Sequence, residues 1–355
     1  MDQNTSRAID MARAFAITMV VVLHTRTGMH FDSESTGVIA DLISRGLGAL
    51  GVPLFLFISG FLSSARKKSA EPSMAVRSIL KRAGDLLGIY VFWNIFVVIA
   101  VFSMIHLGMA PGEFLLARIK DGIAGIFGLN SPFPIAYQFW FIRELIFISV
   151  LVGCVGEFIA NRRILLVFFF AFALLVRLAF DERTLISLVA YCLGYYLGRE
   201  RVESAWRPYA PLLLKSILIG GFTASALLLF QCVRTENWAG LSINVFLVTG
   251  TFTLLSGALI LARRVKTTVW STAAGASFFI FAAHEPLLTA LKKLIGAKLP
   301  AESVYVIAPC VVVIILFSIY WLTSTGIKDR LWFVFRGSRP KGRLREHHPD
   351  TRLAK

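Results

Sequence analysis

Residues 11–29 read MARAFAITMVVVLHTRTGM, and this stretch indicates the class of fold. Its apolar centre is one of many blocks of about twenty apolar residues, the length at which an α-helix crosses the hydrocarbon core of a bilayer. Of the 355 residues, 56% are hydrophobic and only 16% are charged, whereas about a quarter are charged in soluble domains. Because a backbone in lipid must satisfy its own hydrogen bonds, we predict an all-α, polytopic membrane helix bundle.

The spacing of the apolar blocks predicts about ten transmembrane helices, an even number that places both termini on one side. We expect a membrane domain over residues 1–325, followed by a basic, disordered tail over 326–355. The sequence GEFLLARIKDGIAGIFG (112–128) predicts a short surface helix in the longest loop on the opposite side. The predicted spans are about 11–29, 47–65, 84–108, 138–160, 164–180, 185–199, 211–232, 243–262, 273–291 and 303–325.

Lysine and arginine are distributed unevenly between the two sets of loops. The set that contains the N-terminus, 66–83 and the tail holds 24 of them, and the opposite set holds 8. The positive-inside rule therefore predicts cytoplasmic termini and a multi-pass protein of the inner or plasma membrane. This asymmetry accounts for the net charge of +16 without a nucleic-acid partner, and we expect none. The four cysteines form no CxxC pair, so no metal site is predicted.

Two residues in the first span carry a functional hypothesis, since a titratable group inside a membrane is costly. Arg13 and His24 are eleven residues apart, which is about 20° from three full turns, so both lie on one helical face roughly 16 Å apart. Arg13 would lie near the cytoplasmic boundary and His24 well inside, where it would act as a general base. The alternatives are a snorkelling arginine and a histidine that only bonds a neighbouring helix.

The ninth predicted span carries a second polar group. AAHEPLL (282–288) places His284, Glu285 and Pro286 in the middle of that span. Proline removes a helical hydrogen bond, and a broken helix deep in a membrane protein usually lines a cavity. We therefore predict a kink at Pro286 and a functional role for its two titratable neighbours.

Further candidates lie at the two membrane surfaces. Trp140, Arg143 and Glu144 stand at the outer start of the fourth span, where they would bind substrate or anchor the helix at the interface. On the cytoplasmic side, the spacing of a basic cluster places its members on one helical face, where they would bind phosphates or lipid headgroups. This cluster consists of Arg77, Lys81 and Arg82.

Five motifs in order resemble the acyltransferase 3 family of integral membrane acyltransferases, over about residues 5–325. The most specific is Arg, ten residues, His, given by Arg13 and His24. Asp85 departs from the family pattern, because a second arginine is common at its position. The other motifs are GVPLFLFISGFL (51–62), LKRAGDLL (80–87), FWFIREL (139–145) and SFFIFAAHEPLL (277–288).

The resemblance implies transfer of an acyl group, usually acetyl from cytoplasmic acetyl-CoA, to a hydroxyl of a cell-envelope glycan or its lipid-linked precursor. It implies no metal, and a stand-alone member without a fused SGNH domain. Acyl-CoA, the glycan acceptor and membrane lipids are then the expected partners. The catalytic candidates are His24, Arg13, Glu285 and His284; Arg77, Lys81 and Arg82 would bind the donor; and Arg143, Glu144 and Trp140 would bind the acceptor.

Other functions remain open from the sequence. A transporter or flippase of a glycan intermediate also needs intramembrane histidine and glutamate, and a non-enzymatic scaffold needs neither. Within acyl transfer, the donor could be succinyl and the acceptor could be other than a glycan. Whether His24 activates the acceptor directly or carries the acyl group is likewise open.

Overall fold

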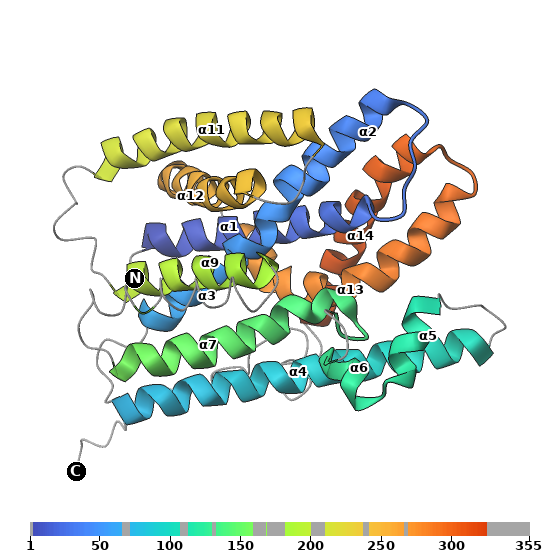
Figure 1. The fold of residues 1–355 in the computed structure, drawn as a ribbon, viewed down its shortest axis with the longest axis horizontal. Coiled ribbons are helices and arrows are strands. Elements are labelled where there is room, and N and C mark those ends of the chain that lie inside the picture. Colours follow the sequence, from blue (N-terminus) through green and yellow to red (C-terminus); the bar gives the residue numbers. More distant parts are fainter. Residues whose placement is uncertain are drawn as a thin grey trace, which may run out of the picture.

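In a computed structural model of the protein, every regular element in the described part of the chain is a helix (Figure 1). Within the described residues, eight helices are long and apolar enough to cross a membrane, and a shorter apolar helix covers Leu185–Gly198. The predicted all-α polytopic bundle is therefore confirmed. The structure describes residues 3–65, 72–106, 113–129, 133–158, 168, 182–199, 210–236, 241–265 and 269–324.

The helices differ in length, and the short ones connect or cap the long ones (Figure 1). The long helices are α1 (Gln3–Thr25), α3 (Gly51–Ala65), α4 (Pro72–His106), α7 (Trp140–Phe158), α9 (Glu182–Arg199), α11 (Ala210–Thr235), α12 (Leu241–Arg264), α13 (Val269–Gly296) and α14 (Ala301–Ser324). The short elements are α2 (Glu34–Asp41), η1 (Leu42–Leu47), η2 (Gly48–Leu50), α5 (Glu113–Lys120), α6 (Ile123–Phe127) and η3 (Tyr137–Phe139).

Each predicted span except 164–180 coincides with a helix; that span, apart from residue 168, and the tail 326–355 lie outside the described residues. The predicted surface helix at 112–128 is present as two pieces, α5 and α6. The first helix begins and ends earlier than the predicted 11–29. It stops after Thr25 because the chain turns there, with Gly28 in a left-handed conformation at φ 72°.

The second membrane helix is one continuous helical stretch, Glu34–Ser64, built from α2, η1, η2 and α3. The element η1 is π-helical, a local widening that often occurs at functional sites. Its buried Ser44 donates to the carbonyl of Val22 and bonds the hydroxyl of Tyr305, which ties this stretch to α1 and α14. At Gly51 a Cβ atom would lie 2.8 Å from the carbonyl oxygen of Ala16, so glycine permits the close approach to α1.

Helices α3 and α9 pack with their backbones nearly in contact. A Cβ atom at Gly60 on α3, or at Gly194 or Gly198 on α9, would overlap a backbone carbonyl of the other helix. Small residues four apart let membrane helices approach closely, because van der Waals packing rather than the hydrophobic effect holds helices together in lipid. These glycines therefore set the distance between two central helices.

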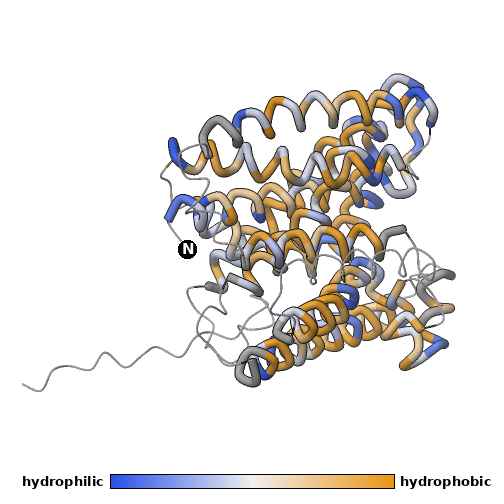
Figure 2. The backbone as a smooth tube through the Cα atoms, turned by 60° about the vertical axis from the view of Figure 1, so that its left-hand side comes forward, coloured by the Kyte–Doolittle hydropathy of each residue, from blue (hydrophilic) through white to orange (hydrophobic). Residues whose placement is uncertain are grey.

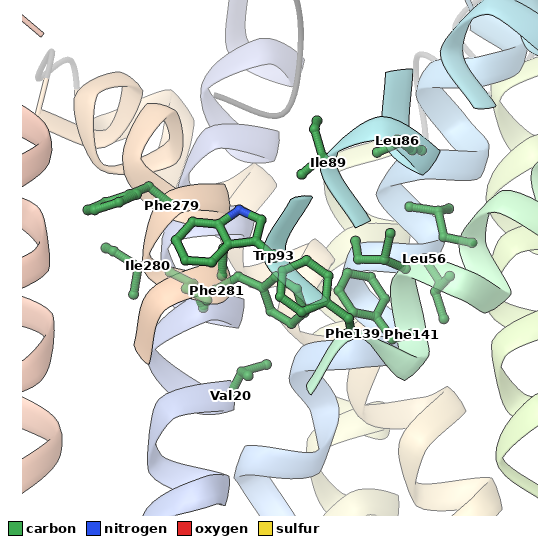
Figure 3. Packing of buried hydrophobic residues seen from close by; sticks show 14 of the residues in the cluster. Val20, Leu56, Leu86, Ile89, Trp93, Phe139, Phe141, Phe279, Ile280 and Phe281 are labelled. Atoms are coloured by element: carbon green, nitrogen blue, oxygen red, sulfur yellow. The ribbon is translucent and has the colours of Figure 1, made fainter. Parts of the chain in front are cut away.

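The largest buried cluster lies among α1, α4, α7, α13 and α14 and is rich in aromatic rings. Figure 3 shows Trp93, Phe139 and Phe281 meeting at its centre; Trp93 and Phe139 are stacked at 6.3 Å between ring centroids. Other apolar side chains face outward, among them Phe222 and Phe230 on α11, as expected for contact with lipid. Figure 2 shows hydrophobic residues along the lengths of the helices and hydrophilic residues mainly near their ends.

Candidate active site

Helices α1 and α13 pack against each other, and polar contacts between side chains join them. Arg13 Nη2 donates to Ser277 Oγ at 3.2 Å. Nearer the end of α1, His24 Nδ1 lies 3.4 Å from His284 Nε2. Arg13 and His24 therefore share the face of α1 that meets α13, as the helical spacing predicted.

The hydrogen bonds of the two histidines assign their ring protons. A backbone carbonyl only accepts, so His284 Nδ1 carries the proton that it donates to the Phe281 carbonyl at 2.7 Å. By the same reasoning, His24 Nδ1 carries a proton directed to the Val20 carbonyl at 2.8 Å. The unprotonated Nε2 of His284 can then accept from His24 Nδ1. When both imidazoles are neutral, His24 therefore has its lone pair on Nε2, and this lone pair is what a base needs to accept a proton.

The depth of His24 differs from the expectation. Because α1 ends at Thr25, His24 lies near the outer end of its own helix rather than well inside it. Its partner His284 is nevertheless fully buried near the middle of α13, since α13 extends well beyond the end of α1. The bundle therefore covers His284, His24 is half-buried, and the pair lies close to the turn at 26–29.

The sequence suggested a broken helix at Pro286, but α13 is one continuous helix from Val269 to Gly296; a kink within it stays a prediction. The proline lacks an N–H group, which frees the carbonyl of Ala282 four residues earlier. The side chain of Gln138, itself 3% exposed, donates to that carbonyl at 3.4 Å. A neighbouring amide thus replaces the missing helical bond, and it also fixes the chain just before α7 against the histidine-bearing helix.

Tyr137 is a site residue that the sequence did not single out. Its ring lies 5.5 Å from the His24 ring between centroids, and its side chain faces Glu285. Glu285 Oε1 accepts from Thr289, whereas the buried Tyr137 hydroxyl and Glu285 Oε2 make no hydrogen bond of regular geometry with the described residues. An aromatic residue before a membrane helix gives no signal of such a role, because tyrosine is common at membrane interfaces.

A hollow of about 470 Å³ opens on the predicted outer side next to the histidine pair. Glu285 contributes to its wall, and so does Lys292, which donates to the carbonyls of Thr25 and Thr27. These hydrogen bonds of Lys292 hold the turn after α1 against α13. The hollow is lined by Thr27, Gly28, Met29, His30, Glu285, Thr289, Lys292, Lys293, Gly296, Leu299, Ala301 and Val304.

A second hollow, of about 830 Å³, lies on the other side of the same turn, between it and α2. Its wall contains an acidic residue between two arginines: Asp41 Oδ1 is 2.8 Å from Arg26 Nε and 3.2 Å from Arg45 Nε. Arg26 also lies over the ring of Phe31. Residues 27–30 therefore line both hollows and lie between them on the predicted outer face.

The predicted basic cluster lies on the first part of α4. Arg77 and Lys81 are exposed, whereas Arg82 is half-buried and donates to Ser63 Oγ at 3.3 Å. That serine also accepts from Tyr191 on α9, so Arg82 joins α4 to the α3–α9 pair. Two members of the cluster are thus accessible to an anionic ligand, and the third is also part of the helix packing.

The three residues at the start of α7 occupy different surroundings. Arg143 Nη1 donates to the carbonyls of Phe127 and Gly128, which end α6. Glu144 is buried, and Trp140 is half-buried against the aromatic core. The contacts of Arg143 position the segment that leads to Tyr137, and a role in binding substrate stays a prediction for all three.

These observations define a multi-pass helical membrane protein with a hydrogen-bonded histidine pair next to an outward-facing hollow. The acyltransferase 3 family model, described as an acyltransferase domain, matches residues 6–324. The chain therefore belongs to this family and is a membrane acyltransferase. No curated protein and no solved structure gave a significant match.

Proposed function

We propose that this acyltransferase moves an acetyl group from cytoplasmic acetyl-CoA to a hydroxyl of a cell-envelope glycan or its lipid-linked precursor. The observation that carries the proposal is the hydrogen-bonded pair of His24 and His284, which leaves the lone pair of His24 on Nε2. A neutral, oriented imidazole is the general base that attack by a hydroxyl needs at neutral pH.

In the proposed reaction, His24 Nε2 removes the proton of the acceptor hydroxyl as its oxygen attacks the carbonyl carbon of the thioester. The tetrahedral intermediate collapses, the carbon–sulfur bond breaks, and CoA leaves as a thiolate. The imidazolium of His24 returns the proton to the thiolate, so the products are the acetyl ester and CoA. The Val20 carbonyl, 2.8 Å from Nδ1, accepts from the ring throughout the reaction and holds its orientation.

The donor and the acceptor would approach from opposite sides of the membrane. The exposed side chains of Arg77 and Lys81 are available to the phosphates of CoA on the predicted cytoplasmic side. Arg13 lies on the same face of α1 as His24, between that side and the histidine pair. The hollow that reaches Glu285 supports access of the acceptor from the predicted outer side. A location in the inner or plasma membrane follows from the same topology.

The test is acetyl transfer by the purified protein in nanodiscs, with labelled acetyl-CoA and envelope glycans from the source cells. Mass spectrometry of glycans from cells with and without the gene identifies the acceptor by the gain of one acetyl unit. We expect a labelled ester with the wild type, and His24→Ala should lose about 10²–10⁴-fold of the rate. Glycans that cross vesicle membranes without any thioester consumption would instead support transport and overturn the proposal.

A further inference from the structure

We propose that Tyr137 is a catalytic residue whose hydroxyl donates a hydrogen bond to the carbonyl oxygen of the acyl group as that oxygen becomes negative. This inference rests on the proposed function, because it assigns a role within acyl transfer at the same site. It begins from a tyrosine that stands outside the sequence motifs and that the fold brings to the histidine pair.

The first observation is an unsatisfied hydroxyl in a buried position. The Tyr137 hydroxyl and Glu285 Oε2 are both buried, and neither makes a hydrogen bond of regular geometry with the described residues. Buried polar atoms are nearly always bonded, and leaving one unsatisfied costs about 1–3 kcal/mol. Two such atoms face each other beside His24. A polar ligand that occupies this place would satisfy both, which is what a substrate's carbonyl and hydroxyl groups can do.

The second observation is how firmly the residue is held from both sides. The preceding backbone N–H, of Ala136, donates to Asn94 Oδ1 at 2.9 Å, and Asn94 is fully buried. The following side chain, of Gln138, donates to the Ala282 carbonyl on α13. Two buried amide side chains, Asn94 of α4 and Gln138 of η3 itself, therefore tie the short turn that carries Tyr137 to α4 and to α13. Catalytic groups need such support, since a misplaced donor stabilises a transition state poorly.

The third observation is the choice of donors next to His24. A developing oxyanion needs an O–H or N–H group, which a carboxylate such as Glu285 does not offer when ionised. His284 directs its Nδ1 proton to the Phe281 carbonyl, and its Nε2 accepts. Among the described residues, the rings of Tyr137 and His284 contact His24, and only that of Tyr137 carries a donor hydrogen that no backbone carbonyl accepts. The base and the oxyanion donor would thus lie side by side.

The step balances within the proposed reaction. As the acceptor oxygen attacks, the electron pair of the carbonyl double bond moves to its oxygen, and the Tyr137 hydroxyl donates a hydrogen bond to it without transferring the proton. The pair returns when the carbon–sulfur bond breaks. Glu285 Oε2 is left to accept from a hydroxyl of the acceptor, which its position on the wall of the outer hollow allows.

The experiment compares Tyr137→Phe with Tyr90→Phe in the purified full-length protein, with acetyl-CoA as donor and the acceptor glycan. Both variants remove one tyrosine hydroxyl, from half-buried Tyr137 and from buried Tyr90, but the Tyr90 hydroxyl donates to the Ile126 carbonyl and serves packing. We expect Tyr137→Phe to lower kcat by about 10²–10³-fold, the usual loss for one oxyanion donor. The KM values for both substrates and the pH dependence of kcat should stay near those of the wild type. Tyr90→Phe should lower the melting temperature and keep kcat.

Three results would overturn the assignment. The first is a Tyr137→Phe variant with wild-type kcat. The second is a loss that appears only as a higher KM for the acceptor, which would make Tyr137 a binding residue. The third is an equal loss of kcat in Tyr90→Phe, which would trace both effects to packing. If the wild type transfers no acetyl group, the proposed function fails first, and that outcome is distinct from these three.

Discussion

Replacing His284 by phenylalanine tests which of the two histidines is the general base. The substitution keeps an aromatic ring of similar size at a fully buried position and removes both ring nitrogens. His24 Nδ1 then loses the acceptor at 3.4 Å but keeps the Val20 carbonyl at 2.8 Å. The lone pair of His24 therefore stays on Nε2, and the base keeps its tautomer.

The expected loss follows from these two distances. A hydrogen bond between neutral groups contributes about 0.5–1.5 kcal/mol net, and the longer of two shared bonds should lie within that range. Since about 1.36 kcal/mol corresponds to tenfold in rate, His284→Phe should lower kcat by roughly two- to tenfold. Removal of the base itself by His24→Ala should cost about 10²–10⁴-fold. The two single variants should thus differ by at least about one order of magnitude.

The assay is kcat for acetyl transfer in nanodiscs, with the thermal melting of each variant recorded in the same preparation. His284→Gln serves as the conservative variant, because its amide oxygen can accept near the position of the lost nitrogen, and it should recover part of the activity. If a stably folded His284→Phe protein is as inactive as His24→Ala, then His284 is the base. The assignment of His24 as the base and of His284 as its hydrogen-bond acceptor would then be wrong. A loss below twofold would show that their contact does not matter for the reaction.

Three further variants and one control variant test the fold and the donor site. Gly194→Ala places a Cβ atom against a backbone carbonyl of α3 and should prevent recovery of folded protein, whereas Gly84→Ala has open space and should raise stability by up to about 1 kcal/mol. Asn94→Leu removes the acceptor of the Ala136 N–H and should destabilise the protein by about 1–3 kcal/mol, measured by thermal melting in detergent. Lys81→Ala should raise the KM for acetyl-CoA severalfold and weaken its dependence on ionic strength, with kcat unchanged.

For each of these three predictions, one result would contradict it. Normal yield and melting of Gly194→Ala would mean that α3 and α9 do not pack backbone to backbone. An unchanged melting temperature for Asn94→Leu would show that water or another group satisfies the Ala136 N–H. A Lys81→Ala protein with wild-type KM at every salt concentration would remove this lysine from the donor site.

Local pattern was enough to predict the helices. Hydrophobic blocks locate membrane helices because the bilayer requires a fixed apolar length, and this physical rule acts on each segment separately. The face shared by Arg13 and His24 also followed from the sequence, since helical periodicity depends only on their separation. The end of α1 did not follow, because it depends on a turn held from outside by Lys292 of α13.

The prediction at Pro286 shows why local rules can fail. Proline removes one hydrogen bond from any helix, but whether the helix breaks depends on what replaces that bond. Here the replacement is Gln138, a residue 144 positions away from the carbonyl that it contacts. Spacing within α13 carries no information about a partner on another helix.

The sequence by itself therefore determined the membrane class, the helical bundle and the helical face that Arg13 and His24 share, because bilayer thickness and helical geometry act locally. Only the tertiary structure decided that His24 meets His284, that Tyr137 stands beside them, and that Glu285 borders an outer hollow. The physical reason is that hydrogen-bond partners and ring contacts between helices depend on how the helices pack, and packing joins residues far apart in the chain.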